Sequence, residues 1–413
     1  MQKTETHIIK ENHPNYAIFH ELSKKTKNLY NAGLYSIKQH YKETGKFKSW
    51  HDVRKEFVAN DNVDYRALPG KVAKDVIRGL GQDMSSLFGL LKLKKQGLYD
   101  KDVKMPYYKD KNGKHIIEFE KQTISKNVNQ LSSGMYEYTL CIRELNIKIL
   151  SKYPEIDCVR IKPKHRSFEI QIIYTVDIPK LKEIKKKNMR IAAIDPGVRN
   201  LITMVFNTGD NPIYVSGGLT KSINQYYNKE KARLQSLLPK KQKTSNRIKV
   251  LTNKRNEKLK WVFHNTSKSI VNFLVENNID TLIIGKSNGW KDETNQGRQN
   301  NQNFVNIPHN KLIQQLQYKS KEVGINVIMQ EESYTSQANF LNGDYIPTYG
   351  VDDHRKNEFT GKRNKGLYET NLNRVINSDV NGAYNILKKA FPKAFRGYGI
   401  EALPGTPSLL KAM

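Results

Sequence analysis

The chain has 413 residues, and 70 lysines and arginines against 40 aspartates and glutamates give it a formal net charge of +30. Such an excess repels itself unless a polyanion neutralises it, so nucleic acid is the expected partner and an ordinary metabolic enzyme is disfavoured. A mean hydropathy of −0.70 argues against membrane insertion. The first residues carry no apolar run after their charges, so we expect no secretory signal and a cytoplasmic, nucleoid-associated protein. Two cysteines, Cys141 and Cys158, cannot build a disulfide framework or a four-thiolate zinc site.

The first half of the chain begins with helical patterns. Apolar residues at three- and four-residue steps predict one helix over 16–41 and a second over 72–91. Lys71, Lys74 and Arg78 lie on the second helix. They form either a solvated face or a phosphate-binding surface, and the charge of the whole chain favours the phosphate-binding surface.

Short runs rich in Ile, Tyr, Val and Thr predict strands around and after these helices. The runs cover residues 5–10, 115–119, 135–142, 158–161 and 168–176. We expect them to form a small β-barrel or sheet module, with the helices of 16–105 inserted into it. A charged linker follows, and it predicts a domain boundary close to Asn188.

The second half predicts an α/β core. Its first strand is an apolar run that ends in Asp195 and is followed by Pro196-Gly197. The elements that follow are strands at 201–206 and 212–216, two basic helices over 223–278, a strand at 281–284, a helix at 308–323 and a strand at 326–329. Strands that alternate with helical crossovers are typical of a sheet covered by helices.

Acidic residues follow two of these strands and begin one helix. Asp195 ends the first strand, Glu331 and Glu332 follow the strand at 326–329, and Asp379 lies at the start of an apolar-faced helix. Taken singly, Asp195 could begin a β-turn and Asp379 could be a helix N-cap, since aspartate serves both purposes often. Taken together, they suit a site for two Mg²⁺ ions about 3.5–4 Å apart, which is the arrangement that hydrolyses phosphodiesters.

Several motifs resemble those of one nuclease family, TnpB, the small transposon-encoded RNA-guided DNA endonucleases related to the type V CRISPR nucleases. The motifs are Ile-Asp-Pro-Gly-Val-Arg-Asn (194–200), Glu-Glu-Ser-Tyr-Thr-Ser-Gln (331–337) and Ser-Asp-Val-Asn-Gly-Ala-Tyr-Asn-Ile (378–386). One branch of the family is resembled further by residues 283–291, 301–304, 307–309 and 359–363. The resemblance is dense over 189–395 and covers the first half only in its organisation.

This resemblance implies a domain plan. The fold class would be α/β with a RuvC-like, RNase H-fold nuclease domain, preceded by a wedge β-barrel that carries an inserted helical recognition domain. The domains would be a wedge barrel of 1–15 and 106–188, a recognition domain of 16–105, a nuclease domain of 189–395 with a basic helical hairpin (223–278) and a lid (338–375), and a tail of 396–413.

The chain departs from the family pattern at its second acid. The usual glutamate at the end of the strand at 281–284 is replaced here by Gly285. The missing acid is then expected from Glu331 or Glu332. Alternation along the strand cannot choose between them, because a central strand is buried on both faces. We favour Glu332 slightly and keep Glu331 as the alternative.

A second departure concerns zinc. Asn339 and Asn342 stand where the family usually has a Cys-x-x-Cys pair, so no structural zinc is expected. Residues 338–375 instead form either a basic lid over the active site or a plain surface loop. Its basic residues are Arg355, Lys356, Lys362, Arg363, Lys365 and Arg374. Among them, Arg374 is the first candidate for contacting the scissile strand, and Lys362 and Arg363 are further candidates for nucleic-acid contact.

The expected function is therefore an RNA-guided endonuclease that cleaves double-stranded DNA beside a short adjacent motif. The expected cofactor is Mg²⁺, with Mn²⁺ as a substitute, held by Asp195, Asp379 and Glu332 or Glu331. The expected partners are a guide RNA from the transposon end and target DNA. Two alternatives remain: an RNA-guided DNA-binding regulator that has lost cleavage, which Gly285 would suit, and a conventional DNA transposase or accessory DNA-binding protein.

Overall fold

The computed structural model describes the whole chain except 126–127, 143–144, 180–188, 241, 287–306, 353–357, 365, 371–373, 396–402 and 412–413. The chain divides into two compact units, Met1–Asp177 and Ile178–Met413. The expected boundary near Asn188 and the resemblance motifs at 287–291 and 301–304 lie outside the described residues, as do Arg355, Lys356 and Lys365.

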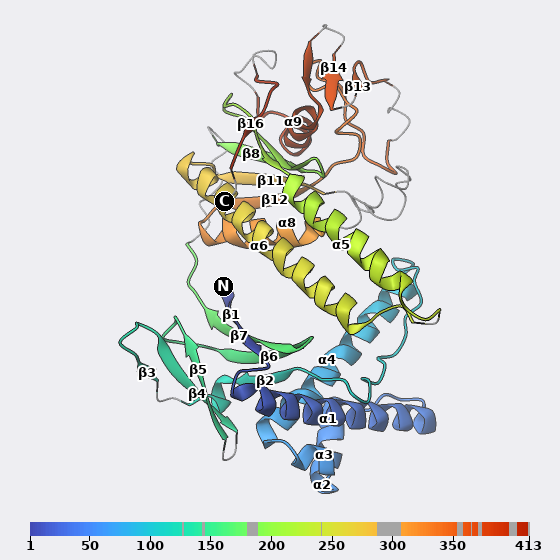
Figure 1. Cartoon of the computed structure of the whole chain (residues 1–413). Helices are drawn as coiled ribbons and strands as arrows, with labels where there is room; N and C mark the ends of the chain where they lie inside the picture. Colours follow the sequence, from blue (N-terminus) through green and yellow to red (C-terminus); the bar gives the residue numbers. More distant parts are fainter. Residues whose placement is uncertain are drawn as a thin grey trace. The chain divides into compact units, whose positions relative to one another are not determined.

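The first unit combines helices with antiparallel strands (Figure 1). Its helices are α1 (Asn15–Thr44), α2 (Trp50–Ala59), α3 (Val63–Arg66) and α4 (Gly70–Lys95). Its strands are β1 (Gln2–Lys10), β2 (Ile117–Glu120), β3 (Asn129–Gln130), β4 (Tyr136–Ile142), β5 (Leu145–Ser151), β6 (Cys158–Lys164) and β7 (Ser167–Thr175), with a 3-10 turn, η1 (Lys121–Thr123). The expected helices and strands are present, and the strand pattern at 145–151 was missed.

Within the described residues, these strands form two sheets. One has the order β1-β7-β6-β2 and the other the order β3-β4-β5. A single bridge between Ile124 and Leu140 stands outside the named strands. The expected wedge barrel therefore stays a prediction, because strand pairing in the described residues shows two open sheets.

The second unit is built on a mixed six-stranded sheet. Its order is β12-β11-β8-β9-β10-β16. The strands are β8 (Ile191–Pro196), β9 (Asn200–Phe206), β10 (Ile213–Ser216), β11 (Thr281–Lys286), β12 (Asn326–Glu331) and β16 (Ser408–Leu409). β8, β11 and β12 run parallel, with Ile194 beside Ile284 and Ile284 beside Met329. Their carboxyl ends therefore meet at one edge of the sheet, which is where parallel sheets of this kind place their sites.

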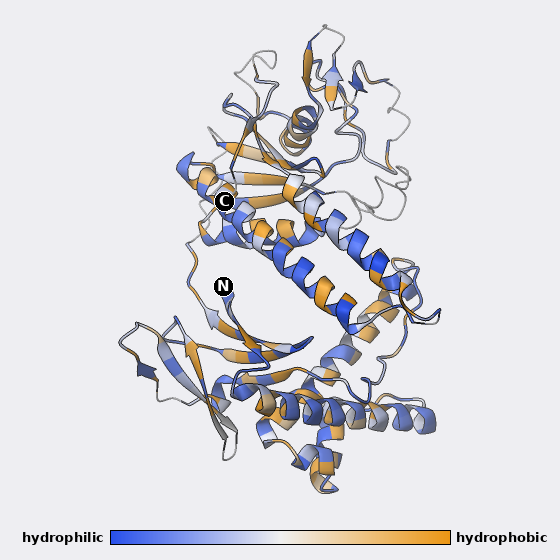
Figure 2. Ribbon diagram, viewed as in Figure 1, coloured by the Kyte–Doolittle hydropathy of each residue, from blue (hydrophilic) through white to orange (hydrophobic). Residues whose placement is uncertain are grey.

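Helices cover both faces of this sheet (Figure 1). One face packs against α6 (Asn246–Glu276) and α8 (His309–Glu322), with α5 (Gly218–Ser236) paired to α6. The other face packs against α9 (Ser378–Ala390). Along β8, Ala192 and Ile194 belong to the core under α6 and α8, whereas Ile191 and Ala193 belong to the core under α9. This alternation is the period-two pattern of a strand buried on both sides, and Figure 2 shows the sheet as mainly hydrophobic.

A small three-stranded sheet leads the chain into α9. Its strands are β13 (Lys362–Asn364), β14 (Leu367–Glu369) and β15 (Val375–Asn377). Asn377 then caps α9, because its side chain accepts hydrogen bonds from the backbone N–H groups of Asp379 and Val380. The region expected as a lid thus contains ordered strands that fix where α9 begins.

No helix in the described part of the chain has both the length and the apolar character needed to cross a membrane.

Replacing Asn377 by Ala removes this cap, so we expect the free energy of unfolding to fall by about 1 kcal/mol. Asn377→Ser keeps a capping oxygen and is the matched control. Thermal unfolding of both variants in EDTA checks the expectation. Equal melting temperatures for the two would show that the cap does not stabilise α9.

Candidate active site

Asp195 lies inside β8, where it is directly opposite Thr203 of β9. The turn occupies 197–199, after the strand has ended. The β-turn alternative for Asp195 is therefore wrong. By alternation Asp195 shares the face of Ile191 and Ala193, which is the face that α9 covers.

A glycine in α9 lets the helix approach this carboxylate. A Cβ atom on Gly382 would lie 2.8 Å from Oδ2 of Asp195, closer than side-chain atoms pack. Gly382 therefore provides the space that Asp195 occupies. Burial raises the pKa of Asp195 well above its usual range, the charges of Glu332 and Asp379 raise it further, and Arg363 opposes them.

Glu332 occupies the space that Gly285 leaves open. A Cβ atom on Gly285 would collide with Oε2 of Glu332 and would lie 2.6 Å from Cδ1 of Ile386. Gly285 is in β11, the strand between β8 and β12. The side chain of Glu332 therefore extends from the end of β12 across β11, toward the strand that carries Asp195. The glycine that the sequence shows in place of an acid is thus the residue that admits the acid from the next strand.

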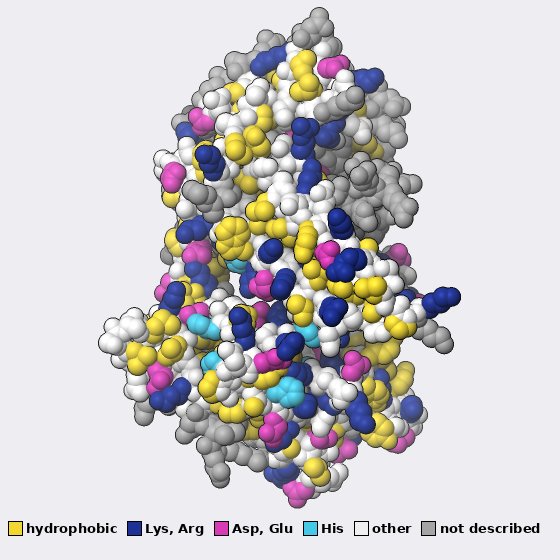
Figure 3. Space-filling view, in the orientation of Figure 1, with side chains coloured by type: hydrophobic (Ala, Val, Ile, Leu, Met, Phe, Trp, Pro, Cys, Tyr) yellow, Lys and Arg dark blue, Asp and Glu magenta, His cyan; other side chains and the backbone are white. Residues whose placement is uncertain are grey.

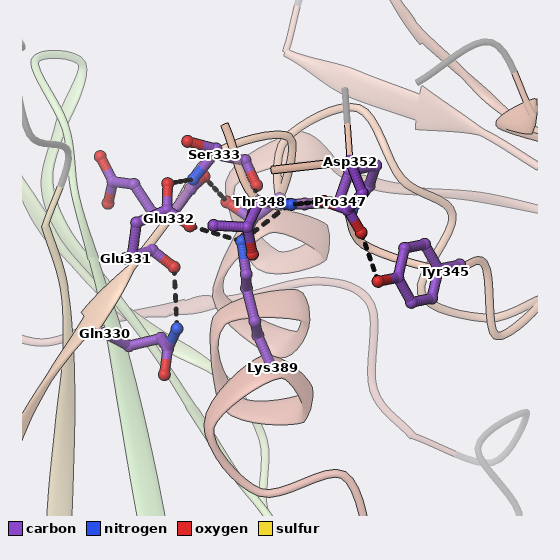
Figure 4. A network of polar contacts seen from close by, with 10 residues as sticks. Gln330, Glu331, Glu332, Ser333, Tyr345, Pro347, Thr348, Asp352 and Lys389 are labelled. Atoms are coloured by element: carbon purple, nitrogen blue, oxygen red, sulfur yellow. Dashed lines mark hydrogen bonds and ion pairs between the residues drawn. The ribbon is translucent and has the colours of Figure 1, made fainter. Parts of the chain in front are cut away.

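Glu331 has different neighbours (Figure 4). Its Oε1 accepts a hydrogen bond of 2.6 Å from the backbone N–H of Ser333, and its Oε2 forms an ion pair of 2.5 Å with Lys389. The pKa of Glu331 is lowered: burial raises it, but the hydrogen bonds from Lys389 and Ser333 lower it by more in sum. The geometry thus favours Glu332 over Glu331 as the partner of Asp195.

Asp379 lies in the first turn of α9, and Asn377 rather than Asp379 is the cap. The alternative that Asp379 is the N-cap is therefore wrong, because the cap lies two residues earlier. The Asp379 carboxylate instead accepts a hydrogen bond of 2.9 Å from Asn200 on Oδ2 and one of 3.2 Å from Arg363 on Oδ1. Asn200 was missed as a site residue, although it closes the first motif that resembles TnpB.

The other expected nucleic-acid contacts are spread over both units. Arg363 alone among them contacts one of the acids in the described structure. Arg374 donates a hydrogen bond of 2.9 Å to the carbonyl of Leu403. In the first unit, Arg78 is paired with Glu120 and Asp75, and Lys71 donates to the carbonyl of Gln122 at 3.2 Å. Lys362 is exposed and Lys74 is half-buried, and their roles stay predictions.

Asn339 and Asn342, which stand where the family usually has zinc-binding cysteines, belong to a hydrogen-bonded cluster. The side chain of Asp344 accepts from the N–H of Asn339 and from the N–H of Thr360, both at 2.9 Å. The side chains of Asn339 and Asn342 both donate to Oγ1 of Thr360, at 3.2 and 3.0 Å. This cluster of two asparagines, Asp344 and Thr360 holds 339–344 against the segment that enters β13.

The donor chemistry of the three acids fits a hard divalent cation, because carboxylate oxygens are its preferred ligands. The space left by Gly285 and Gly382 brings Glu332 and Asp195 toward the same edge. Within the described residues, no group of three or more His, Cys, Asp or Glu side chains already converges on one cation position. The Asp379 carboxylate is bound instead by two protein donors, Arg363 and Asn200.

Adding one methyl group at Gly285 should displace Glu332. We expect Gly285→Ala to weaken Mn²⁺ binding about tenfold, since overpacking at such a contact costs about 1–3 kcal/mol. Isothermal titration calorimetry measures the affinity. Gly218→Ala is the control, because a Cβ there meets only Oγ of Ser216 at an ordinary 3.4 Å. Unchanged Mn²⁺ binding by Gly285→Ala would contradict the assignment of Glu332.

The raised pKa of Asp195 also predicts a stability effect. Because its folded-state pKa is raised, the charged form destabilises the fold at neutral pH and the protonated form does not. Asp195→Asn should therefore raise the melting temperature in EDTA at pH 7.5 by roughly 2–4 °C, the shift that about 1 kcal/mol produces in a unit of this size. The gain should shrink as the pH falls. Asp210→Asn, at an exposed position, is the control. A lower melting temperature for Asp195→Asn than for the native chain, at pH 7.5 and at lower pH alike, would contradict the expectation.

Comparison with known proteins gives matches along most of the chain. A family model described as a probable transposase (OrfB_IS605) matches residues 171–291, and a model described as the Cas12f1-like TNB domain matches residues 309–386. The TnpB-like protein ORF457 of Acidianus two-tailed virus is 22% identical over 404 residues, covering 88% of this chain and 81% of that protein.

Solved structures are similar over long stretches at low scores. A Cas12f1–sgRNA–target DNA complex matches at 18% identity with a TM-score of 0.33, covering 93% of this chain and 98% of that one. The mini-RNA-guided endonuclease CRISPR-Cas_phi3 matches at 9% identity with a TM-score of 0.48, covering 98% and 93%. The matches to the transposase and TNB-domain models and to a TnpB-like protein support the assignment of the chain to the TnpB family.

Proposed function

We propose that the chain is an RNA-guided, Mg²⁺-dependent DNA endonuclease of the RuvC type, encoded by a transposon. One observation carries the proposal: Asp195 in β8, Glu332 directly after β12 and Asp379 in α9 come together at one edge of the sheet, where the charges of Glu332 and Asp379 raise the pKa of Asp195. Crowding three carboxylates costs free energy, and a metal-dependent site gives a reason to bear that cost.

Asp195, Glu332 and Asp379 would hold the metal. Bound Mg²⁺ supplies an activated water and stabilises the leaving oxygen of the phosphodiester. The residues of the chain itself set where that chemistry takes place. Gly285 and Gly382 leave room for two of the acids, and Asn200 orients the third through its hydrogen bond to Asp379. Arg363 forms an ion pair with Asp379. If a metal ion took the place of Arg363 beside Asp379, the freed guanidinium could bind a phosphate oxygen.

The surface chemistry suits nucleic-acid partners. Figure 3 shows lysine and arginine side chains spread over the visible face of each unit. In the first unit, Tyr107 and Tyr108 are 71% and 46% exposed and could stack on unpaired bases. We propose a guide RNA from the transposon end and double-stranded target DNA as partners. Base pairing would then read the sequence, while the protein reads backbone shape and a short adjacent motif.

The structure bears on the main alternative, a guided DNA-binding regulator that has lost cleavage. Gly285 was the feature in its favour. The carboxylate of Glu332 now lies against that glycine, so the place of the absent acid is filled. This supports an active enzyme over the regulator. A conventional transposase stays as an outcome of the experiment below.

The experiment co-expresses the full chain with its flanking DNA, sequences the RNA that copurifies, and assays Mg²⁺-dependent cleavage of DNA beside a randomised motif. We expect bound RNA from one flank and cleavage next to one motif. Asp195→Ala and Glu332→Gln should each lower the cleavage rate by about 10³-fold or more, whereas Glu331→Gln should lower it far less.

Each failure has its own meaning. Cleavage that survives Asp195→Ala would overturn the catalytic assignment, and the absence of bound RNA would overturn the guide. Loss with Glu331→Gln but not with Glu332→Gln would reverse the choice between the two glutamates. Guided binding without any cleavage would establish the regulator, and joining of DNA ends would establish the transposase.

A further inference from the structure

Two neighbouring glutamates stand at the end of β12, Glu331 as its last residue and Glu332 directly after it, yet their carboxylates have different neighbours. Glu332 lies against Gly285, and Glu331 is bound by Ser333 and Lys389. Alternation along β12 directs Glu332 to the face that α9 covers, yet Glu331 also contacts α9, through Lys389. The contacts of Lys389 therefore decide whether the Glu331 carboxylate is held apart from the other acids (Figure 4).

Lys389 is itself held in place. Its side chain is only 10% exposed. Its Nζ donates to Oε2 of Glu331 at 2.5 Å, to the carbonyl of Pro347 at 2.9 Å and to the carbonyl of Ser333 at 3.4 Å. An ammonium group has three N–H donors, and these three acceptors match them. Lys389 is therefore a fixed cation, and Glu331 binds to it rather than following Glu332 toward the other acids.

The side of α9 that carries Lys389 also binds the rest of the segment 331–340, which begins with the two glutamates. Asn381, Asn385 and Lys389 follow one another at four-residue steps, which places them on one side of a helix. Asn381 donates to the carbonyl of Ala338 at 2.8 Å, and Asn385 donates to the carbonyls of Thr335 and Ala338 at 2.8 and 2.7 Å. Residues 331–340 are thus fastened to the helix that also carries Asp379 and Gly382.

We propose that Lys389 is a positioning residue that keeps Glu331 out of the metal site and thereby directs Glu332 into it. The inference rests on the proposed function, because it concerns the same site. Without Lys389, Glu331 loses its fixed cation, and the backbone next to Glu332 loses its anchor. Loss of such an outer contact weakens metal binding about 10–100-fold in known metal sites.

The test measures Mn²⁺ binding to the full-length chain by isothermal titration calorimetry, with melting temperatures in EDTA alongside. We expect Lys389→Met to weaken Mn²⁺ binding about 10–100-fold and Lys389→Arg to restore part of it. Lys388→Met is the matched control, because Lys388 is the adjacent lysine of α9 and donates to the carbonyl of Asp344 at 2.8 Å. It should leave Mn²⁺ affinity unchanged.

A double-mutant cycle separates positioning from simple loss of stability. If Lys389 acts through Glu331, Lys389→Met should weaken Mn²⁺ binding far less in a Glu331→Gln background than in the native chain. Full additivity, an unchanged affinity in Lys389→Met, or an equal loss in Lys388→Met would each overturn the inference. Failure of the native chain to bind Mn²⁺, or binding unaffected by Asp195→Ala, would overturn the proposed metal site and this inference together.

Discussion

The burial of Asp195 beside two other carboxylates is the constraint that the second unit has to meet. Burial makes the ionisation of Asp195 costly, and the charges of Glu332 and Asp379 add to that cost. The opposing free energy comes from the packing of α9, whose Val380, Ala383, Tyr384, Ile386 and Leu387 are almost completely buried. Large aliphatic and aromatic side chains contribute up to about 1.5–3 kcal/mol each on burial. The burial of these α9 side chains can therefore offset a cost of a few kcal/mol at the acids.

α9 is also the element through which the site is assembled. It carries Asp379 in its first turn, leaves space for Asp195 at Gly382, and fastens the segment that bears Glu332 through Asn381, Asn385 and Lys389. A shift of α9 along its axis would therefore alter all three acids at once. The cap at Asn377 touches none of the acids' oxygens, but it holds the first turn of the helix that positions them.

Much of this arrangement could be predicted from the sequence, because it depends on local patterns. Apolar runs predicted β8, β9, β10, β11 and β12, and the ends of β8 and β12 located Asp195 and the two glutamates, whereas β13 to β16 were not predicted. The choice of Glu332 could not be made, since it depends on which face of the sheet α9 covers. Once α9 is placed on the face of Ala193 and Ile328, alternation puts Glu332 on that face.

Other features depend on contacts distant in sequence. Arg78 and Arg374 resemble surface cations in the sequence, but their partners Glu120 and Leu403 lie 42 and 29 residues away. The pairing of the first unit's strands into two sheets is likewise a long-range property. β5 is a different kind of miss, because buried Ile147 and Ile149 flank exposed Lys148 and the alternation was visible in the sequence.

The contact between Gly285 and Glu332 also limits how this site could have changed over time. A glutamate at 285 would bring a side chain into the space that Glu332 already fills, and a glycine at 285 without Glu332 would leave the site one acid short. The two arrangements are therefore mutually exclusive, and a substitution that is harmful at one position can be harmless once the other has changed. A lineage can move its acid from one strand to the next only through an intermediate that is crowded or incomplete. Each arrangement, once reached, is difficult to leave.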